Sequence, residues 1–172
     1  MFLALGLAVT VLLLLERGRG GRRREAELEA IESAAGPDDL AARLERERPE
    51  TWVRQFDPAA SAGGCSLVLY QRRLPVLIDM NGRILHRWPQ VRAVGRARLD
   101  RAGRLAVIGA DNLIKEYDWD GRLRWFFRLP KPEDLPHHDL IRLANGRYLV
   151  LAQDAGDLSD YLLEVDRRGR VV

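Results

Sequence analysis

The sequence predicts an all-β fold, a partial β-propeller of about two and a half four-stranded blades that follows an N-terminal membrane helix and a short helical stalk. Three observations lead to this prediction: a recurring glycine-centred turn, short apolar segments on both sides of each turn, and a different composition in the N-terminal part. We divide the chain into a membrane anchor at 1–16, a basic helical stalk and linker at 17–62, and a partial β-propeller at 63–172.

The turns of the sheet region alternate between two patterns. One is centred on Gly103 and Gly146, and the other on Gly82, Gly121 and Gly169. The sequence Asp-x-x-Gly-Arg occurs at all three glycines of the second group and at Gly103. Equivalent glycines recur after roughly forty to fifty residues, which is the length of one propeller blade. Two hairpins in each period predict four strands in each blade.

The predicted strands follow from these turns. Short apolar segments at 65–70, 75–79 and 83–88 predict three strands of an incomplete first blade, and residues 96–128 predict a complete one. The next blade begins with a hairpin at 139–144 and 147–153, joined by Asn145-Gly146, a dipeptide typical of tight turns. Because four blades are the usual minimum, we expect the chain to be the N-terminal part of a longer protein or a truncated product.

The first fifteen residues are aliphatic and uncharged, which predicts burial in lipid. As a helix they span only about 22 Å, against a hydrocarbon core of ~30 Å. They also lack the basic start and the small-residue cleavage site of a signal peptide. We therefore interpret 1–16 as an uncleaved single-helix membrane anchor, with a buried core helix as the alternative.

Charged segments follow the anchor. An arginine cluster at 17–24 either holds the C-terminal side in the cytoplasm by the positive-inside rule or lies on anionic headgroups. Residues 25–50 are rich in helix formers and are interrupted at Gly36-Pro37, and Asp38 is a candidate cap for a second short helix that ends at Arg48. We expect a helical stalk with a solvated face.

The composition restricts the function. It is globular, with 47% hydrophobic and 31% charged residues and a net charge of +3. No basic stripe with interleaved aromatic residues is present, so we predict no nucleic-acid partner. Cys65 is the only cysteine, which excludes a disulfide within the chain.

In a propeller, the first strand of each blade conventionally lines the central channel, and the loop that leads into it opens at one mouth of that channel. The candidate site lies at this position. The catalytic candidates there are His137, His138 and Asp139. In the preceding blade the equivalent position is Gly95, which is followed by Arg96 and Arg98. Histidine beside arginine suits an anion, because guanidinium supplies paired donors and imidazole acts as a base or nucleophile near neutral pH.

Arg98 and Arg142 are the candidate substrate-binding residues, the second because it follows on the predicted inner strand. Two histidines and an aspartate at 137–139 are possible metal ligands, but adjacent residues of an extended chain point in opposite directions, so we predict no metal. His86 precedes Trp88 in an outer strand, where we expect it to pack at the surface. Packing between blades explains the recurring Trp88, Trp119 and Trp125 better than a ligand cage does.

Three segments together resemble the arylsulfate sulfotransferase (arylsulfotransferase, ASST) family, in the N-terminal part of its propeller. They are LIDMNGRILHRW at 77–88, EYDWDGRLRW at 116–125 and HHDLIRLANGR at 137–147. The resemblance covers roughly 65–172, and its most specific pieces are Asp-Trp-Asp-Gly and His-His-Asp.

The resemblance implies a six-bladed propeller that transfers a sulfuryl group from a phenolic sulfate donor to a phenol acceptor through a transiently sulfated channel histidine. It implies no cofactor, assigns Asp139 as an orienting acceptor, and indicates an extracytoplasmic sheet domain, whereas the arginine cluster indicates the cytoplasm. A non-catalytic propeller that binds a partner is the alternative, since fold alone does not determine function. A quinone-type redox propeller is a third, weaker possibility.

Overall fold

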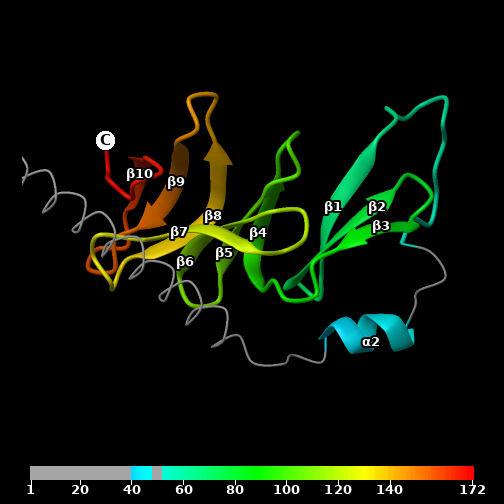
Figure 1. Cartoon of the computed structure of the whole chain (residues 1–172), viewed down its shortest axis with the longest axis horizontal. Helices are drawn as coiled ribbons and strands as arrows, with labels where there is room; N and C mark the ends of the chain where they lie inside the picture. Colours follow the sequence, from blue (N-terminus) through cyan, green and yellow to red (C-terminus); the bar gives the residue numbers. More distant parts are fainter. Residues whose placement is uncertain (1–39, 48–51) are drawn as a thin grey trace, which may run out of the picture. The chain divides into compact units, whose positions relative to one another are not determined.

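The computed structural model describes residues 40–47 and 52–172. The chain divides into two units, Met1–Gly36 and Pro37–Val172, and the described residues all belong to the second. This unit is mostly β-structure arranged in three antiparallel sheets, which confirms the predicted all-β class (Figure 1). The predicted anchor at 1–16 lies outside the described residues, among which no helix is long and apolar enough to cross a membrane.

Each sheet is a meander of strands that are consecutive in the chain. The first sheet consists of β1 (Cys65–Tyr70), β2 (Leu74–Asp79) and β3 (Ile84–Arg87). The second consists of β4 (Ala93–Leu99), β5 (Leu105–Gly109), β6 (Leu113–Tyr117) and β7 (Leu123–Arg128). The third consists of β8 (Leu135–Arg142), β9 (Tyr148–Gln153) and β10 (Asp160–Val165). The strand β4 contacts both β1 and β8, so the three sheets follow one another with β4 in the middle.

The five predicted turns share one geometry. In each, the glycine N–H donates to the carbonyl three residues earlier, and that earlier residue donates its own N–H to the carbonyl of the arginine after the glycine. The glycines have φ between 76° and 83°. At 145–146 only Gly146 has a positive φ, so the turn is the three-residue kind with one left-handed glycine, rather than the two-residue Asn-Gly turn that the dipeptide indicated.

Aspartate side chains stabilise four of these five turns. The Oδ1 atom of Asp100, for example, accepts the N–H groups of Ala102 and Arg104 at 2.8 and 3.0 Å. The carboxylates of Asp79, Asp118 and Asp166 accept backbone N–H groups of their own turns in the same way. This is the physical reason for the Asp-x-x-Gly-Arg repeat, because the carboxylate pairs amides that the turn leaves without a backbone acceptor.

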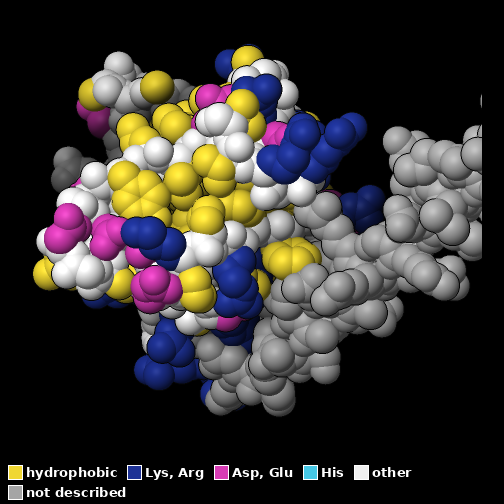
Figure 2. Space-filling model, turned by 90° about the vertical axis from the view of Figure 1, so that its left-hand side faces the viewer, with side chains coloured by type: hydrophobic (Ala, Val, Ile, Leu, Met, Phe, Trp, Pro, Cys, Tyr) yellow, Lys and Arg dark blue, Asp and Glu magenta, His cyan; other side chains and the backbone are white. Residues whose placement is uncertain are grey.

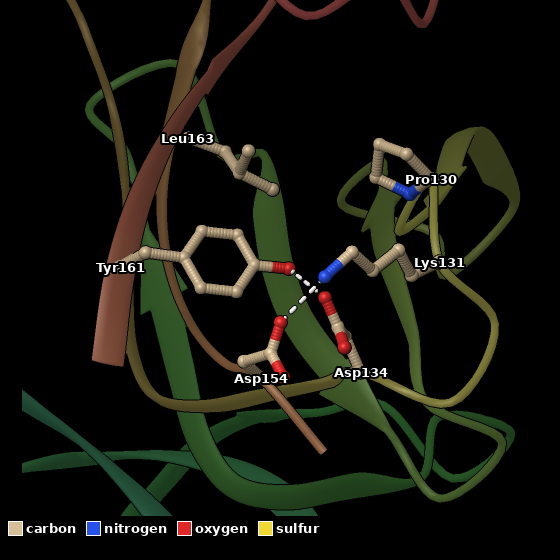
Figure 3. Close-up of a pocket in the computed structure, with 6 residues that line it drawn as sticks. All are labelled: Pro130, Lys131, Asp134, Asp154, Tyr161 and Leu163. Carbon is tan, nitrogen blue, oxygen red and sulfur yellow. Dashed lines mark hydrogen bonds and ion pairs between the residues drawn. The ribbon is translucent and has the colours of Figure 1, made fainter. Parts of the chain in front are cut away.

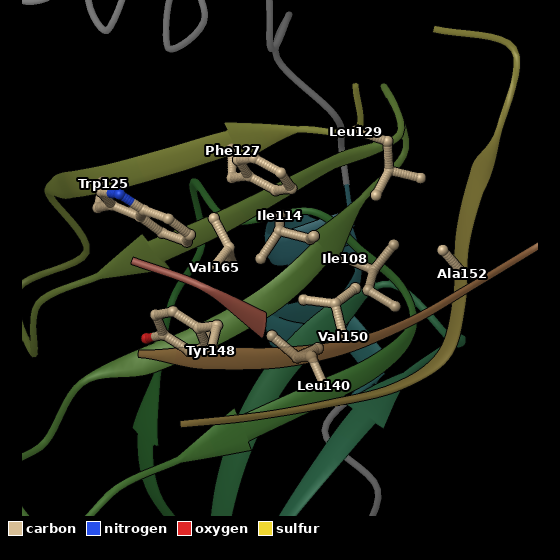
Figure 4. Packing of buried hydrophobic residues seen from close by; sticks show 11 residues of the cluster. Ile108, Ile114, Trp125, Phe127, Leu129, Leu140, Tyr148, Val150, Ala152 and Val165 are labelled. Carbon is tan, nitrogen blue, oxygen red and sulfur yellow. The ribbon is translucent and has the colours of Figure 1, made fainter. Parts of the chain in front are cut away.

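The largest described core lies between the second and third sheets (Figure 4). The second sheet contributes Ala106, Ile108, Ile114, Trp125, Phe127 and the nearby Leu129, and the third contributes Leu140, Tyr148, Val150, Ala152 and Val165. Alternation along β9 explains the division, because Tyr148, Val150 and Ala152 point toward the second sheet and the residues between them point away.

A helix packs on the outer face of the first sheet and forms a second apolar cluster there. The helix α2 (Leu40–Glu47) contributes Leu44, which is 1% exposed and packs with Leu74, Val76 and Ile78. Trp52 and Val53 pack against the same cluster. The helix lies within the range of the predicted stalk. Its residues Ala42, Arg43 and Arg46 are exposed, as expected for a solvated face. Leu44, in contrast, is a core residue of the sheet region.

Candidate functional site

The candidate histidines lie inside strand β8 and not in the loop that leads into it. The strand begins at Leu135, four residues before the predicted start, and its register with β9 shifts between Pro136 and Leu140. Residues 137–139 form the resulting bulge, and bulges of this kind re-aim side chains at functional sites.

The bulge is repeated in the preceding sheet with a different residue at its centre. Strand β4 shifts register against β5 between Ala93 and Ala97, and Gly95 at its centre has φ +75°. At the equivalent place in β8, His138 has φ 60°. A left-handed conformation is easy for glycine but costs a residue with a Cβ about 1–2 kcal/mol. The third sheet therefore holds a histidine where its neighbour uses glycine, and strain of this kind is concentrated at functional sites.

Two arginines from β4 hold this bulge. Arg96 Nε donates to the His138 carbonyl at 2.8 Å and lies 3.4 Å from Asp139 Oδ1. Arg98 donates from Nε to Asp139 Oδ1 at 3.1 Å and from Nη2 to Oδ2 at 2.7 Å, which is a two-pronged pair. Because residues two apart on a strand point to the same face, both guanidinium groups reach the same side of β8.

The arginines favour the ionised form of Asp139. Hydrogen bonding from Arg98 holds the pKa of this carboxyl below its usual value, partial burial opposes the shift, and the N–H of Leu140 supports it at 2.8 Å. Asp139 is therefore ionised at neutral pH, and its charge balances that of Arg98. The Asp139 carboxylate and the Arg98 guanidinium are therefore already paired with each other.

His137 has a different partner. Its Nε2 lies 2.9 Å from Asp160 Oδ1, at the start of β10, and its ring meets that of His138 edge-on with centroids 4.4 Å apart. In the neutral ring a carboxylate beside Nε2 favours the tautomer that has its proton on Nε2, which leaves the lone pair on Nδ1. This pair is the arrangement in the site that most resembles an activated nucleophile or base.

Arg142, the other predicted substrate-binding residue, is engaged elsewhere. Its Nε lies 3.7 Å from Glu116 Oε2, and its Nη1 lies 3.8 Å from Asp100 Oδ2. The Nε atom is buried and has no hydrogen-bond partner. Glu116 is 1% exposed, accepts a hydrogen bond from Tyr148 Oη, and pairs with Arg167 at 2.7 Å. The structure thus places Arg142 in a polar cluster between the second and third sheets, whereas it brings Arg98 to Asp139.

His86 lies in an aromatic cluster, in agreement with the predicted packing role. Its ring stacks on Trp119 with centroids 4.0 Å apart and meets Trp88 edge-on at 4.4 Å. Its Nε2 lies 2.9 Å from the Trp119 carbonyl.

Sequence reasoning missed Asp160 as a member of the site. It is 23 residues from His137 in the chain, in a strand of ordinary composition. The only available signal was register, because Leu135 and Asp160 pair with the same residue of β9, Gln153. That register requires knowing that β8 begins before the histidines.

A separate pocket of about 310 Å³ opens beside β10 (Figure 3). It is lined by Pro130, Lys131, Asp134, Asp154, Tyr161 and Leu163. Lys131 pairs with Asp154 at 2.5 Å, and Tyr161 donates to the buried Asp134, which together with burial of the phenol raises the pKa of Tyr161 to about 12. The polar groups are matched with one another, and none of the predicted site residues lines this pocket.

Within residues 40–47 and 52–172, no group of three or more His, Cys, Asp or Glu side chains could hold a metal ion. The sequence matches no known protein-family model, and no curated protein matches it. The site is therefore defined by its own geometry: a histidine oriented by a carboxylate, beside a strained histidine that two arginines hold from the neighbouring sheet.

Proposed function

We propose that the three sheets are consecutive blades of a β-propeller in which β4 and β8 are the innermost strands. Two observations support this proposal: the alternating turns have one geometry, and β4 and β8 lie side by side with bulges at equivalent positions. By the same equivalence, β1 corresponds to β5, so the first sheet has no counterpart of β4 among the described residues.

On this fold we propose a membrane-anchored protein similar to arylsulfotransferases, with its sheet domain outside the cytoplasm. The proposed activity is transfer of a sulfuryl group from a phenolic sulfate donor to a phenol acceptor through a histidine of the site. The observation that carries it is the His137–Asp160 pair, because an oriented neutral imidazole is both a good nucleophile and a good leaving group.

In the proposed reaction the Nδ1 lone pair of His137 attacks sulfur. The bond from sulfur to the phenolic oxygen breaks, and the donor leaves as a phenolate that takes a proton from water. The ring, now positively charged, keeps its Nε2 proton against Asp160, whose carboxylate offsets that charge. The acceptor phenol then gives its proton to the hydroxide left by the first step and attacks sulfur, and the bond from nitrogen to sulfur breaks with its electron pair returning to Nδ1.

The test is transfer from p-nitrophenyl sulfate to an acceptor phenol by the whole chain, followed as p-nitrophenol release. We expect His137→Ala to abolish transfer, and Asp160→Asn to reduce it by about 10²- to 10⁴-fold, the usual contribution of a positioned acid or base. The third histidine provides the matched control. His86 lies in the aromatic cluster and not in the candidate site, so His86→Asn should retain activity. Undiminished transfer by His137→Ala would contradict the assigned role.

A non-catalytic propeller that binds a partner is the second candidate, and one observation favours it. Arg96 and Arg98 both face Asp139, so the carboxylate offsets the positive charge that would stabilise a sulfuryl group. Under this alternative the arginines and Asp139 only hold the bulge. The binding module predicts no p-nitrophenol release above the rate in buffer.

A further inference from the structure

We propose that Gln153 on β9 is a positioning residue, which holds the Asp160 carboxylate against His137. The proposal rests on the sulfuryl-transfer function proposed above, because the His137–Asp160 pair would carry that reaction. Gln153 pairs in register with Leu135 on one side and with Asp160 on the other. It therefore lies in the central strand of the third sheet, between the strands that supply the two members of the pair.

The side-chain nitrogen of Gln153 has two acceptors. Its Nε2 donates to the Leu158 carbonyl at 3.2 Å and to Asp160 Oδ1 at 3.5 Å, the longer of the two bonds. A side-chain amide nitrogen carries two hydrogens, so it serves both acceptors at once. Because a carbonyl and a carboxylate only accept, the NH2 end of the amide must face them. The Asp160 Oδ1 atom thus lies between two donors, Gln153 Nε2 and His137 Nε2.

The neighbouring side chains on this face of the sheet are apolar. Residues that are opposite each other in register leave a sheet on the same face, so Gln153 and Asp160 share the outward face of the third sheet. The next row on that face is Leu151 with Leu162. Figure 2 views the molecule from the side on which the third sheet lies in Figure 1, and apolar side chains gather there with charged groups around them. Beside the Asp160 carboxylate, the sheet therefore offers the Gln153 amide as its donor.

The other acceptor of Gln153 belongs to the loop that leads into Asp160. Leu158 has φ 63°, a left-handed conformation that residues with a Cβ rarely adopt. The Gln153 amide holds the carbonyl of this residue, as Arg96 Nε holds the carbonyl of the left-handed His138 at 2.8 Å. Each member of the pair therefore lies within two residues of a strained backbone segment whose carbonyl a side chain holds.

The second sheet has neither of these side chains at the equivalent position. Gln153 corresponds to Ala110, counted from the glycine of the preceding turn. Asp160 corresponds to Asn112, counted from the glycine of the following turn. There β5 and β6 are joined by a tight turn, whereas β9 and β10 stay paired up to Gln153 and Asp160 and are joined by a longer loop. Formation of such a sheet therefore does not require an amide beside a carboxylate, and this leaves the positioning of Asp160 as the role of Gln153.

The experiment records the ring N–H signals of the whole chain by nuclear magnetic resonance, in mild detergent and with isotope-labelled histidine. The chain has three histidines, so single variants assign their signals. In the wild type we expect the neutral His137 ring to hold its proton on Nε2, with the downfield N–H signal of a hydrogen bond to a carboxylate. We expect Gln153→Ala to lose this signal and to populate the other tautomer as well. Gln153→Met should do the same, because it keeps the bulk of the side chain and removes both N–H groups.

A double variant and a matched control separate positioning from general damage to the fold. Asp160→Ala should lose the same signal, and Gln153→Ala added to it should change nothing further, because Gln153 acts through Asp160. The control is Gln90→Ala, since Gln90 Nε2 also donates to a backbone carbonyl, that of Asp120 in the second sheet, at 2.9 Å. It should leave the His137 signal unchanged.

The transfer assay gives a second readout. We expect Gln153→Ala and Gln153→Met to lower kcat for p-nitrophenyl sulfate by about ten- to hundredfold with KM unchanged, because the residue orients the nucleophile and does not hold the substrate. A His137 signal that persists in both Gln153 variants would overturn the proposal. So would a signal that persists in Gln153→Met alone, or one that Gln90→Ala also removes. Absence of transfer by the wild type would instead contradict the proposed function, and the ring signal would still decide the role of Gln153.

Discussion

His138 shares its backbone conformation with its repeat equivalent, Gly95, and differs from it in carrying a side chain. Its φ of 60° matches the 75° of Gly95, and the Arg96 side chain holds its carbonyl. Packing and turn formation do not require a histidine at this position, since the neighbouring sheet forms the same bulge with glycine.

We predict that His138→Gly does not lower the free energy of unfolding and raises it by up to about 1 kcal/mol, because relief of the backbone strain exceeds or balances the entropy of glycine in the unfolded chain. The matched variant is Gly95→Ala. A Cβ there meets nothing within 4 Å, so only the positive φ is penalised, and we expect a loss of about 1 kcal/mol. Urea denaturation measures both. A large loss of stability in His138→Gly would contradict this prediction, because it would show that the fold itself requires the histidine side chain.

The turns determine how predictable each sheet element is from the sequence. The Asp-x-x-Gly-Arg repeat encodes its own hydrogen bonds, so the strands next to the turns could be predicted within one or two residues, as β2 and β3 show. The bulge in β8 could not, because it depends on register with β9 and on arginines of β4, and no local pattern specifies it. The same long-range register explains why His137 could be predicted and its partner Asp160 could not.

We predict that Asp100→Ala lowers the free energy of unfolding by about 1–2 kcal/mol, comparable to the loss of a helix cap. The substitution removes the acceptor for two backbone N–H groups and for Arg104 Nε at 2.8 Å. Asp120 offers the control, because its side chain is 69% exposed and its pair with Arg122 spans 3.8 Å. Asp120→Ala should change stability by less than about 0.5 kcal/mol. Equal losses in thermal or urea denaturation would refute the proposed role of the turn aspartates.

The same carboxylates predict an acid-sensitive stability. Hydrogen bonding from the backbone N–H of Arg170 lowers the pKa of Asp166 to about 2, from 3.8. A carboxyl whose pKa is lowered by folding stabilises the protein above its unfolded value, and this contribution disappears as the pH falls through the folded value. We expect the melting temperature to fall between pH 4 and pH 2, and to fall less over that interval in Asp166→Asn. A melting temperature that is constant over this interval would contradict the assignment.

At the scale of the described chain, the contact between the second and third sheets encloses the larger of the two apolar clusters described above. The apolar core supplies most of this contact, and Glu116 supplies its polar centre, with Tyr148 and Arg167 on the opposite sheet. Burial and the Glu116 hydrogen bond raise the pKa of Tyr148, so the phenol remains a donor at all physiological pH values. The sequence predicted the sheets and their order, but this polar cluster joins residues from three strands and a turn and was not predictable.

We predict that Glu116→Ala lowers the free energy of unfolding by about 2–3 kcal/mol, because it leaves the buried Tyr148 hydroxyl without its acceptor and Arg167 without its partner. The repeat provides the control at Glu164, whose pair with Arg147 is partly exposed at 31% and 39%. Glu164→Ala should cost no more than about 1 kcal/mol. Chemical denaturation compares the two, and similar losses would show that the buried cluster does not hold the sheets together.

The central claim is that His137 carries the transferred group, and the most direct measurement is rapid mixing of the whole chain with p-nitrophenyl sulfate in the absence of an acceptor phenol. The account predicts a burst of one p-nitrophenol per chain, present in the wild type and in His86→Asn and absent in His137→Ala. Sequencing of the trapped protein by mass spectrometry should place the sulfuryl group on His137. A wild type without a burst, or a burst that persists in His137→Ala, would contradict the claim.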